Sequence, residues 1–127
     1  MRDRKKAQAL AHELVSKMTI EERASQLKFD APPVERLGVP AYNWWNEALH
    51  GVARAGTATM FPQPVAMASM FDPEMIRKIG DVVATEARAK YNALSRRGDR
   101  GIYKGLTCWS PNINIFRDPR WGRGHET

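Results

Sequence analysis

The sequence has a single cysteine in 127 residues, Cys108, so it can form no intrachain disulfide and no cysteine cluster for a metal ion. It also lacks any apolar run near the roughly 18 residues of a membrane span. Its basic N-terminus is not followed by the continuous apolar stretch of a secretory signal. These absences predict a cytoplasmic protein without a metal or a membrane partner.

Charge of one sign is nowhere concentrated, although the formal net charge is +6. Residues 1–28 carry seven Lys or Arg against four acids, residues 29–94 six against seven, and residues 95–127 seven against three. No segment has the dense basic run or the helical Arg/Lys stripe that favours phosphate binding. We therefore expect a solvated basic surface rather than a nucleic-acid interface.

The first third of the chain predicts two helices and an extended connector. Apolar residues recur at helical spacing over 3–17, and Thr19 with Glu22 forms a capping box at the start of a second helix, 20–27. Three prolines interrupt residues 30–40, which predicts an extended connector.

The remainder predicts strand, helix and strand. The aromatic run at 41–45 is typical of a short strand, and Asp72-Pro-Glu begins a helix that extends to about residue 95. A second strand follows from Leu106 to the turn at Ser-Pro-Asn. This order predicts an α/β fold with a parallel sheet, whose functional residues follow the strands.

Two clusters follow these predicted strands and have a chemistry suited to sugars. A sugar ring needs an aromatic wall for its C–H face, and carboxylates or guanidinium groups for its hydroxyls. The first cluster contains Trp44, Trp45 and Glu47, and the second contains Arg117, Arg120, Trp121 and Arg123.

Each cluster also has a structural interpretation. Adjacent tryptophans on a strand point to opposite faces, so at least one belongs to the core. His50 is expected to be a hydrogen-bonded structural histidine, and one or two of the arginines can pair with Asp118 or Glu126 to hold their loop.

Four ordered motifs then resemble one known family. They are WNEALHG at 45–51, ATxFPQ at 58–63, ATEARA at 84–89 and WSPNINIFRDPRWGRGxE at 109–126. In this order and at these spacings the sequence is similar to the N-terminal domain of glycoside hydrolase family 3. The Trp-Trp pair with Glu at position 47 resembles the bacterial β-xylosidase and β-glucosidase branch.

The resemblance implies a fold and a set of binding residues. The fold is the N-terminal portion of a (β/α)8 barrel, in a retaining β-glycosidase that needs no cofactor. By motif, Glu47 and Arg123 correspond to residues that bind hydroxyls of the sugar at the cleaved position. Trp45 and Trp121 are weaker candidates for the wall of that site, and Glu126 is expected to be structural.

The resemblance also implies that residues 1–127 are a partial domain of two or three β/α units, because a barrel of this kind takes about 250 residues. The nucleophile and the acid/base are expected further along a longer chain. An oligosaccharide is the expected substrate, and the rest of the enzyme chain the expected partner. The alternative is a non-catalytic carbohydrate-binding or regulatory remnant of the same fold.

Overall fold

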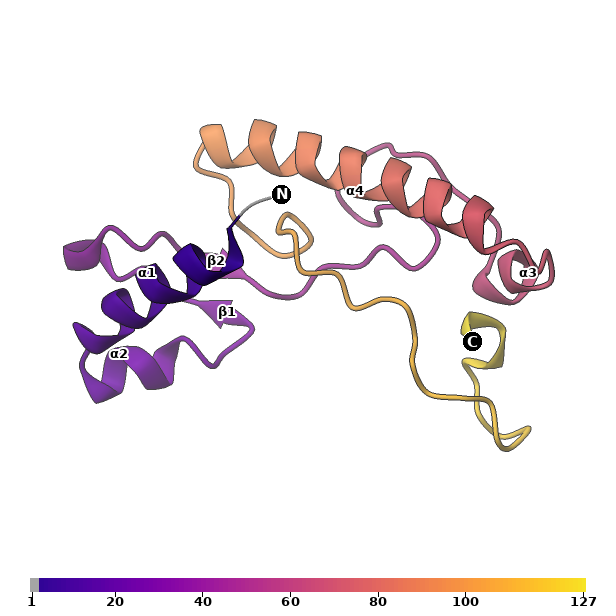
Figure 1. Ribbon diagram of the computed structural model, residues 1–127, viewed down its shortest axis with the longest axis horizontal. Helices are drawn as coiled ribbons and strands as arrows, with labels where there is room; N and C mark the ends of the chain where they lie inside the picture. Colours follow the sequence, from indigo (N-terminus) through magenta and orange to yellow (C-terminus); the bar gives the residue numbers. More distant parts are fainter. Residues whose placement is uncertain (1–2) are drawn as a thin grey trace. The chain divides into compact units, whose positions relative to one another are not determined.

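A computed structural model describes residues 3–127 (Figure 1), which divide into two compact units that meet between Tyr42 and Asn43. The first unit contains the helices α1 (Arg4–Ser16) and α2 (Ile20–Ser25). The second contains α3 (Pro64–Ala68), α4 (Pro73–Arg96) and a terminal 3-10 turn, η2 (Gly124–Glu126).

The caps of the first two helices explain where each begins. The Asp3 carboxylate accepts hydrogen bonds from the backbone N–H groups of Lys5 and Lys6, at the start of α1. Before α2, the Thr19 hydroxyl accepts from the Glu22 N–H at 3.2 Å, and the Glu22 carboxylate accepts from the Thr19 N–H at 2.9 Å. The predicted capping box is therefore confirmed, because both reciprocal bonds are present.

The connector after α2 is more ordered than the sequence predicts. It contains a short strand, β1 (Asp30–Ala31), and a 3-10 turn, η1 (Glu35–Leu37). Arg36 fastens this turn, since its guanidinium pairs with the Glu22 carboxylate and donates at 2.8 Å to the Lys17 carbonyl. The chain then returns to pair β2 (Tyr42–Asn43) with β1. The prolines limit the length of the extended segments but do not prevent this pairing.

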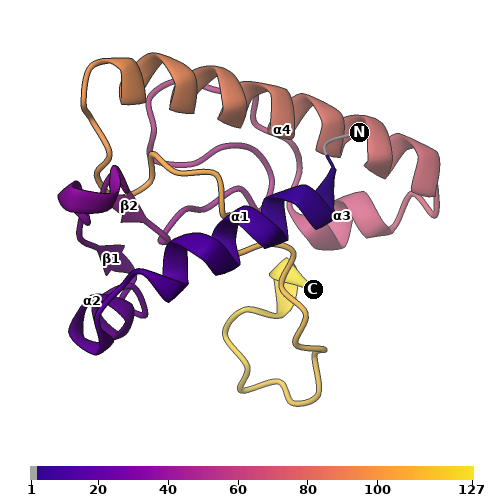
Figure 2. The ribbon, with the colours of Figure 1, turned by 60° about the vertical axis from the view of Figure 1, so that its left-hand side comes forward.

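In the second unit, α4 follows the predicted start. Asp72 accepts a hydrogen bond from the Met75 N–H at 3.0 Å, and Pro73 occupies the first helical turn, where its missing N–H costs nothing. The helix ends at Arg96, one residue beyond the predicted limit. In Figure 2 the loop that precedes α3 runs beside this long helix.

The two predicted strands of the parallel sheet are much shorter than the sequence indicates. Of the stretch 41–45, only Tyr42 and Asn43 form a named strand, and this strand pairs with β1. The second stretch forms a single parallel bridge, between Asn46 and Cys108. The short strand expected over 41–45 is thus present in part, as β2, whereas the strand expected from Leu106 is reduced to this one bridge.

The chain buries few large apolar side chains. Its accessible surface is 9630 Å², whereas a folded protein of 14.4 kDa exposes about 6800 Å². Phe71, Leu27 and Ile113 are each more than 85% exposed, and none of the described large side chains is fully buried. A core of this size contributes little hydrophobic free energy against the entropy of ordering the chain.

We predict that the purified 127-residue chain binds a hydrophobic dye and self-associates, because these apolar side chains lack cover. Dye fluorescence and sedimentation velocity would measure this, with the helices still visible by far-UV circular dichroism. A monomer that unfolds cooperatively and does not increase the fluorescence of the dye would contradict the prediction.

Candidate functional site

The loop after Trp45 forms most of the wall of a cavity of about 390 Å³ in the second unit. Glu47 and His50 stand at its start, the backbone of 56–60 forms another side, and His125 and Glu126 close it from the C-terminal segment. Of the two predicted sugar-binding clusters, only Glu47 lines this cavity, and the residues that follow the second cluster, His125 and Glu126, also lie in its wall.

Glu47 presents its carboxylate to this cavity with 46% of the side chain exposed. Glu47 forms an ion pair with Arg54, whose Nε lies 3.7 Å from a Glu47 oxygen and whose guanidinium sits 5.4 Å from the centre of the Tyr103 ring. A contact of that length at an exposed site is weak. The carboxylate can therefore exchange it for the hydroxyls of a ligand.

Arg123 lies within the electrostatic reach of Glu47. The Arg123 guanidinium donates from Nε and Nη2 to one oxygen of Glu126, the Nε bond being 2.7 Å long. That ion pair is the main cause of a raised Arg123 pKa, and the negative charge of Glu47 adds to it. The two residues that the sequence predicts to bind one sugar thus lie in the same part of the unit.

Glu126 is the less exposed of the two acids that line the cavity, with 17% of its side chain exposed. Its pKa is lowered, first by the hydrogen bond from Arg123 and further by the positive potential of that arginine, His125 and His50. The stabilisation from this pair is therefore present above the ordinary carboxyl pKa and is lost as the pH falls through the lowered value.

His50 has the structural contact expected for it. Its Nδ1 lies 2.9 Å from the Phe61 carbonyl oxygen, which can only accept, so Nδ1 donates. The Phe61 N–H in turn donates at 2.8 Å to the His50 carbonyl. These two bonds tie the start of the cavity loop to its end.

The loop between them is held by α4. The Glu86 carboxylate accepts from the Thr59 N–H at 3.0 Å and from its hydroxyl at 2.7 Å, and Lys90 donates to the carbonyls of Ala55 and Thr57. The Thr59 bonds are also the main cause of the lowered pKa of Glu86. The ATEARA motif thus contributes the carboxylate that fixes the loop.

One of the aromatic candidates packs on another tryptophan. Trp45 stacks on Trp109, with ring centres 4.8 Å apart and planes 24° apart. The Trp109 indole also donates at 2.9 Å to the Trp44 carbonyl. Neither Trp45 nor Trp121 lines the cavity beside Glu47. Sequence reasoning missed Trp109, although its place at the end of the second predicted strand is the signal that could have found it.

The arginine-rich loop pairs largely with itself. Arg120 donates to both carboxylate oxygens of Asp118 at 2.8 Å, which lowers the pKa of that acid. Arg120 therefore has the structural role considered from the sequence, because it pairs with Asp118 within its own loop. Arg123 has such a role in part, since it pairs with Glu126.

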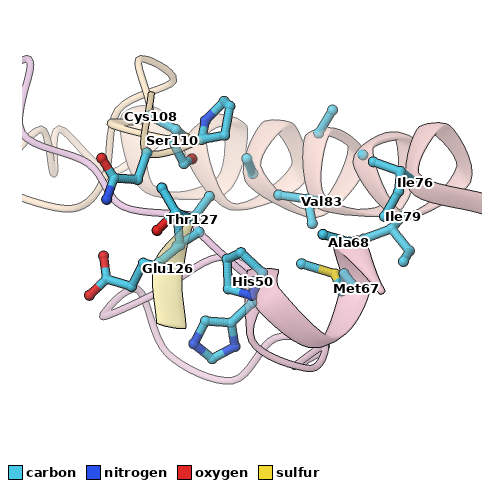
Figure 3. Close-up of a pocket in the computed structure, with 18 of the residues that line it drawn as sticks. His50, Met67, Ala68, Ile76, Ile79, Val83, Cys108, Ser110, Glu126 and Thr127 are labelled. Atoms are coloured by element: carbon cyan, nitrogen blue, oxygen red, sulfur yellow. The ribbon is translucent and has the colours of Figure 1, made fainter. Parts of the chain in front are cut away.

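A second, larger cavity of about 620 Å³ lies against the apolar face of α4 (Figure 3). Ile76, Ile79 and Val83 line it from that helix, and Met67 lines it from α3. Cys108 faces the same space, and burial raises its thiol pKa, which disfavours the reactive thiolate. The apolar face of α4 therefore faces a hollow rather than a closed core.

Within residues 3–127, no group of three His, Cys, Asp or Glu residues is placed to hold a metal ion. None of the helices in that range is long and apolar enough to cross a membrane.

Comparisons with known proteins agree with the motifs. The family model described as "Glycosyl hydrolase family 3 N terminal domain" matches residues 3–127. Probable beta-D-xylosidase 7 of Arabidopsis thaliana is 52% identical over 92% of this chain and 16% of its own length. Xylan 1,4-beta-xylosidase of Xylanibacter ruminicola is 46% identical over 95% of this chain and 14% of its own length.

A solved structure gives the same result for the fold. A GH3 exo-beta-xylosidase (XlnD), in complex with a xylobiose aziridine activity-based probe, matches with a TM-score of 0.73 and 40% identity over 90% of this chain and 15% of that chain. The predicted fold, the N-terminal portion of a glycoside hydrolase barrel, is thereby confirmed. The chain belongs to glycosyl hydrolase family 3.

We predict that Gly51→Ala disrupts the cavity loop. Gly51 has a φ of +130°, and a Cβ there would lie 2.2 Å from the Thr59 carbonyl oxygen, so the backbone must move. The expected loss of stability is about 2 kcal/mol or more in denaturant unfolding of a protein that carries this chain.

The matched control is Gly38→Ala. Gly38 has a φ of +66° but open space around the added Cβ, so it incurs the backbone strain alone, about 1 kcal/mol. Equal losses at the two glycines would contradict a close approach at Gly51.

Proposed function

We propose that this chain is a sugar-binding part of the N-terminal domain of a retaining β-glycosidase. The enzyme would remove terminal β-linked xylose or glucose from oligosaccharides. The observation that carries the proposal is a cavity lined by both Glu47 and Glu126, the ion-pair partner of Arg123, in a chain whose named relatives are xylosidases. The chain spans 14–16% of the length of those relatives, so the activity belongs to a longer polypeptide.

The chemistry of the cluster supports sugar binding. An ionised carboxylate accepts hydrogen bonds from neighbouring hydroxyls, while a guanidinium donates to hydroxyl oxygens, and charge-assisted bonds of this kind are stronger than neutral ones. Glu47 is exposed enough to meet a ligand. The resemblance to family 3 implies an Asp at this position in other members, and the Glu side chain is one methylene longer. We propose that the extra length shortens the pocket toward a pentose.

Bond cleavage needs further residues. A retaining glycosidase uses two carboxyl groups about 5 to 5.5 Å apart, one as nucleophile and one as acid/base. We assign neither role within this chain, since Glu47 is the binding carboxylate by motif and Glu126 is committed to Arg123. The wall roles of Trp45 and Trp121 and the cytoplasmic location stay predictions from the sequence.

The second candidate is a carbohydrate-binding remnant without catalysis. It would use the same Glu47 and Arg123, and the cavity that Glu47 lines would serve it without a nucleophile. Continuation of the reading frame to a downstream nucleophile separates the two proposals.

We predict that Glu47→Gln in the full-length enzyme lowers kcat/KM on nitrophenyl β-xyloside about 10- to 100-fold. The amide keeps the shape but loses the charge, and a charge-assisted hydrogen bond contributes about 1.5 to 3 kcal/mol. Steady-state kinetics on the xyloside and the glucoside would measure both the loss and the pentose preference.

The matched control is Glu74→Gln, which removes the same charge from the exposed start of α4. Kinetics that change equally in the two variants, or an unaltered Glu47→Gln enzyme, would contradict the proposal. The 127-residue chain alone should show no turnover, and measurable hydrolysis by it would contradict the assignment of the reacting carboxyls elsewhere.

A further inference from the structure

Asn46 is the one polar residue in the described part of the chain that is buried, at 3% exposure. It sits between Trp45 and Glu47 at the parallel bridge to Cys108. A polar group taken out of water must recover its hydrogen bonds or lose stability, so the partners of this carboxamide indicate why it is there.

Those partners all lie in the two segments that the bridge joins. The Asn46 Nδ2 donates at 3.0 Å to the Asn43 carbonyl and at 3.1 Å to the Thr107 carbonyl. Its Oδ1 accepts from the Gly105 N–H at 2.6 Å. The backbone adds a fourth link, since the Trp109 N–H donates to the Asn46 carbonyl at 2.9 Å.

Only a carboxamide of this length makes both side-chain connections. A carboxylate could accept from Gly105, but it has no N–H to donate to Thr107. An apolar side chain of the same shape could do neither. The side chain therefore fixes one alignment of the two segments, where the single backbone bridge would also allow a slipped one.

That alignment matters for the neighbour of Asn46. A slip of one residue in an extended segment turns each side chain to the opposite face. At this junction a slip would move the Glu47 carboxylate away from the cavity. Such a slip would weaken the electrostatic attraction between Glu47 and Arg123. It would also separate Trp45 from Trp109, which stack across the same junction.

We propose that Asn46 is a positioning residue, which holds the Glu47 carboxylate at the sugar cavity by locking the register between residues 43–47 and 105–109. The inference rests on the proposed function, because it concerns the use of Glu47 in binding. Asn46 itself acts through Glu47 and need not touch the ligand.

The test compares Asn46→Asp with Asn92→Asp in the full-length enzyme. Both exchange an amide for a carboxylate, but Asn92 is exposed on α4. We expect Asn46→Asp to lower kcat/KM on nitrophenyl β-xyloside about 10- to 100-fold, mainly through KM, while Asn92→Asp stays within about twofold of the parent. Thermal unfolding sets an assay temperature at which both variants remain folded.

A double variant distinguishes positioning from a general loss of stability. If Asn46 acts through Glu47, then Asn46→Asp should cost far less in an enzyme that already carries Glu47→Gln, so the two losses should not multiply. Asn46→Ser, whose shorter hydroxyl cannot reach both Gly105 and Thr107, should lose activity to a similar extent.

Three results would overturn the inference. They are an unaltered kcat/KM in Asn46→Asp, losses that multiply fully in the double variant, or failure of both Asn46 variants to fold, which would show a purely structural role. An inactive parent would remove the proposed function and this inference together. An active parent that is impaired by Glu47→Gln but not by Asn46→Asp would refute the inference alone.

Discussion

The junction between residues 43–47 and 105–109 is the constraint on which the second unit depends. Two parallel segments cannot be joined by a tight turn and need a crossover, which here consists of the cavity loop, α3 and α4. The loop is fastened to α4 by Glu86 and Lys90, and the end of the crossover returns to Asn46 through Gly105. The candidate site lies directly after the first of the two segments, where the chain enters the cavity loop at Glu47.

The helices and their starts could be predicted from the sequence because the signals are local. The Thr19 and Glu22 box and the Asp72-Pro73 start each depend on residues within one turn, and both are present in the structure. Register and strand length depend on neighbours far along the chain. For this reason the strands in the structure, β2 and one bridge, are shorter than those that the sequence predicts. The single polar residue that sets the register could not be identified from a pattern of apolar spacing.

The candidate site was predicted in part for the same reason. The motifs named Glu47 and Arg123, but no local rule predicts that Trp45 stacks on Trp109 rather than lining the cavity. The aromatic pair draws on segments more than sixty residues apart, as does the Asn46 bond to Thr107 with a separation of 61. The sequence motifs propose the chemistry of the site, whereas the arrangement of its walls depends on long-range contacts that no local pattern encodes.

The pairing of Arg123 with Glu126 is compatible with the ligand-binding role proposed for the arginine. The two residues are three apart around the 3-10 turn η2, where side chains at that spacing eclipse and meet. A guanidinium has five N–H donors, and Glu126 takes one from Nε and one from Nη2, both to a single oxygen. The remaining donors include the pair on Nη1, which can meet the hydroxyls of a sugar. Because Glu126 orients the guanidinium before a ligand arrives, binding of the ligand would not carry the entropic cost of ordering that long side chain.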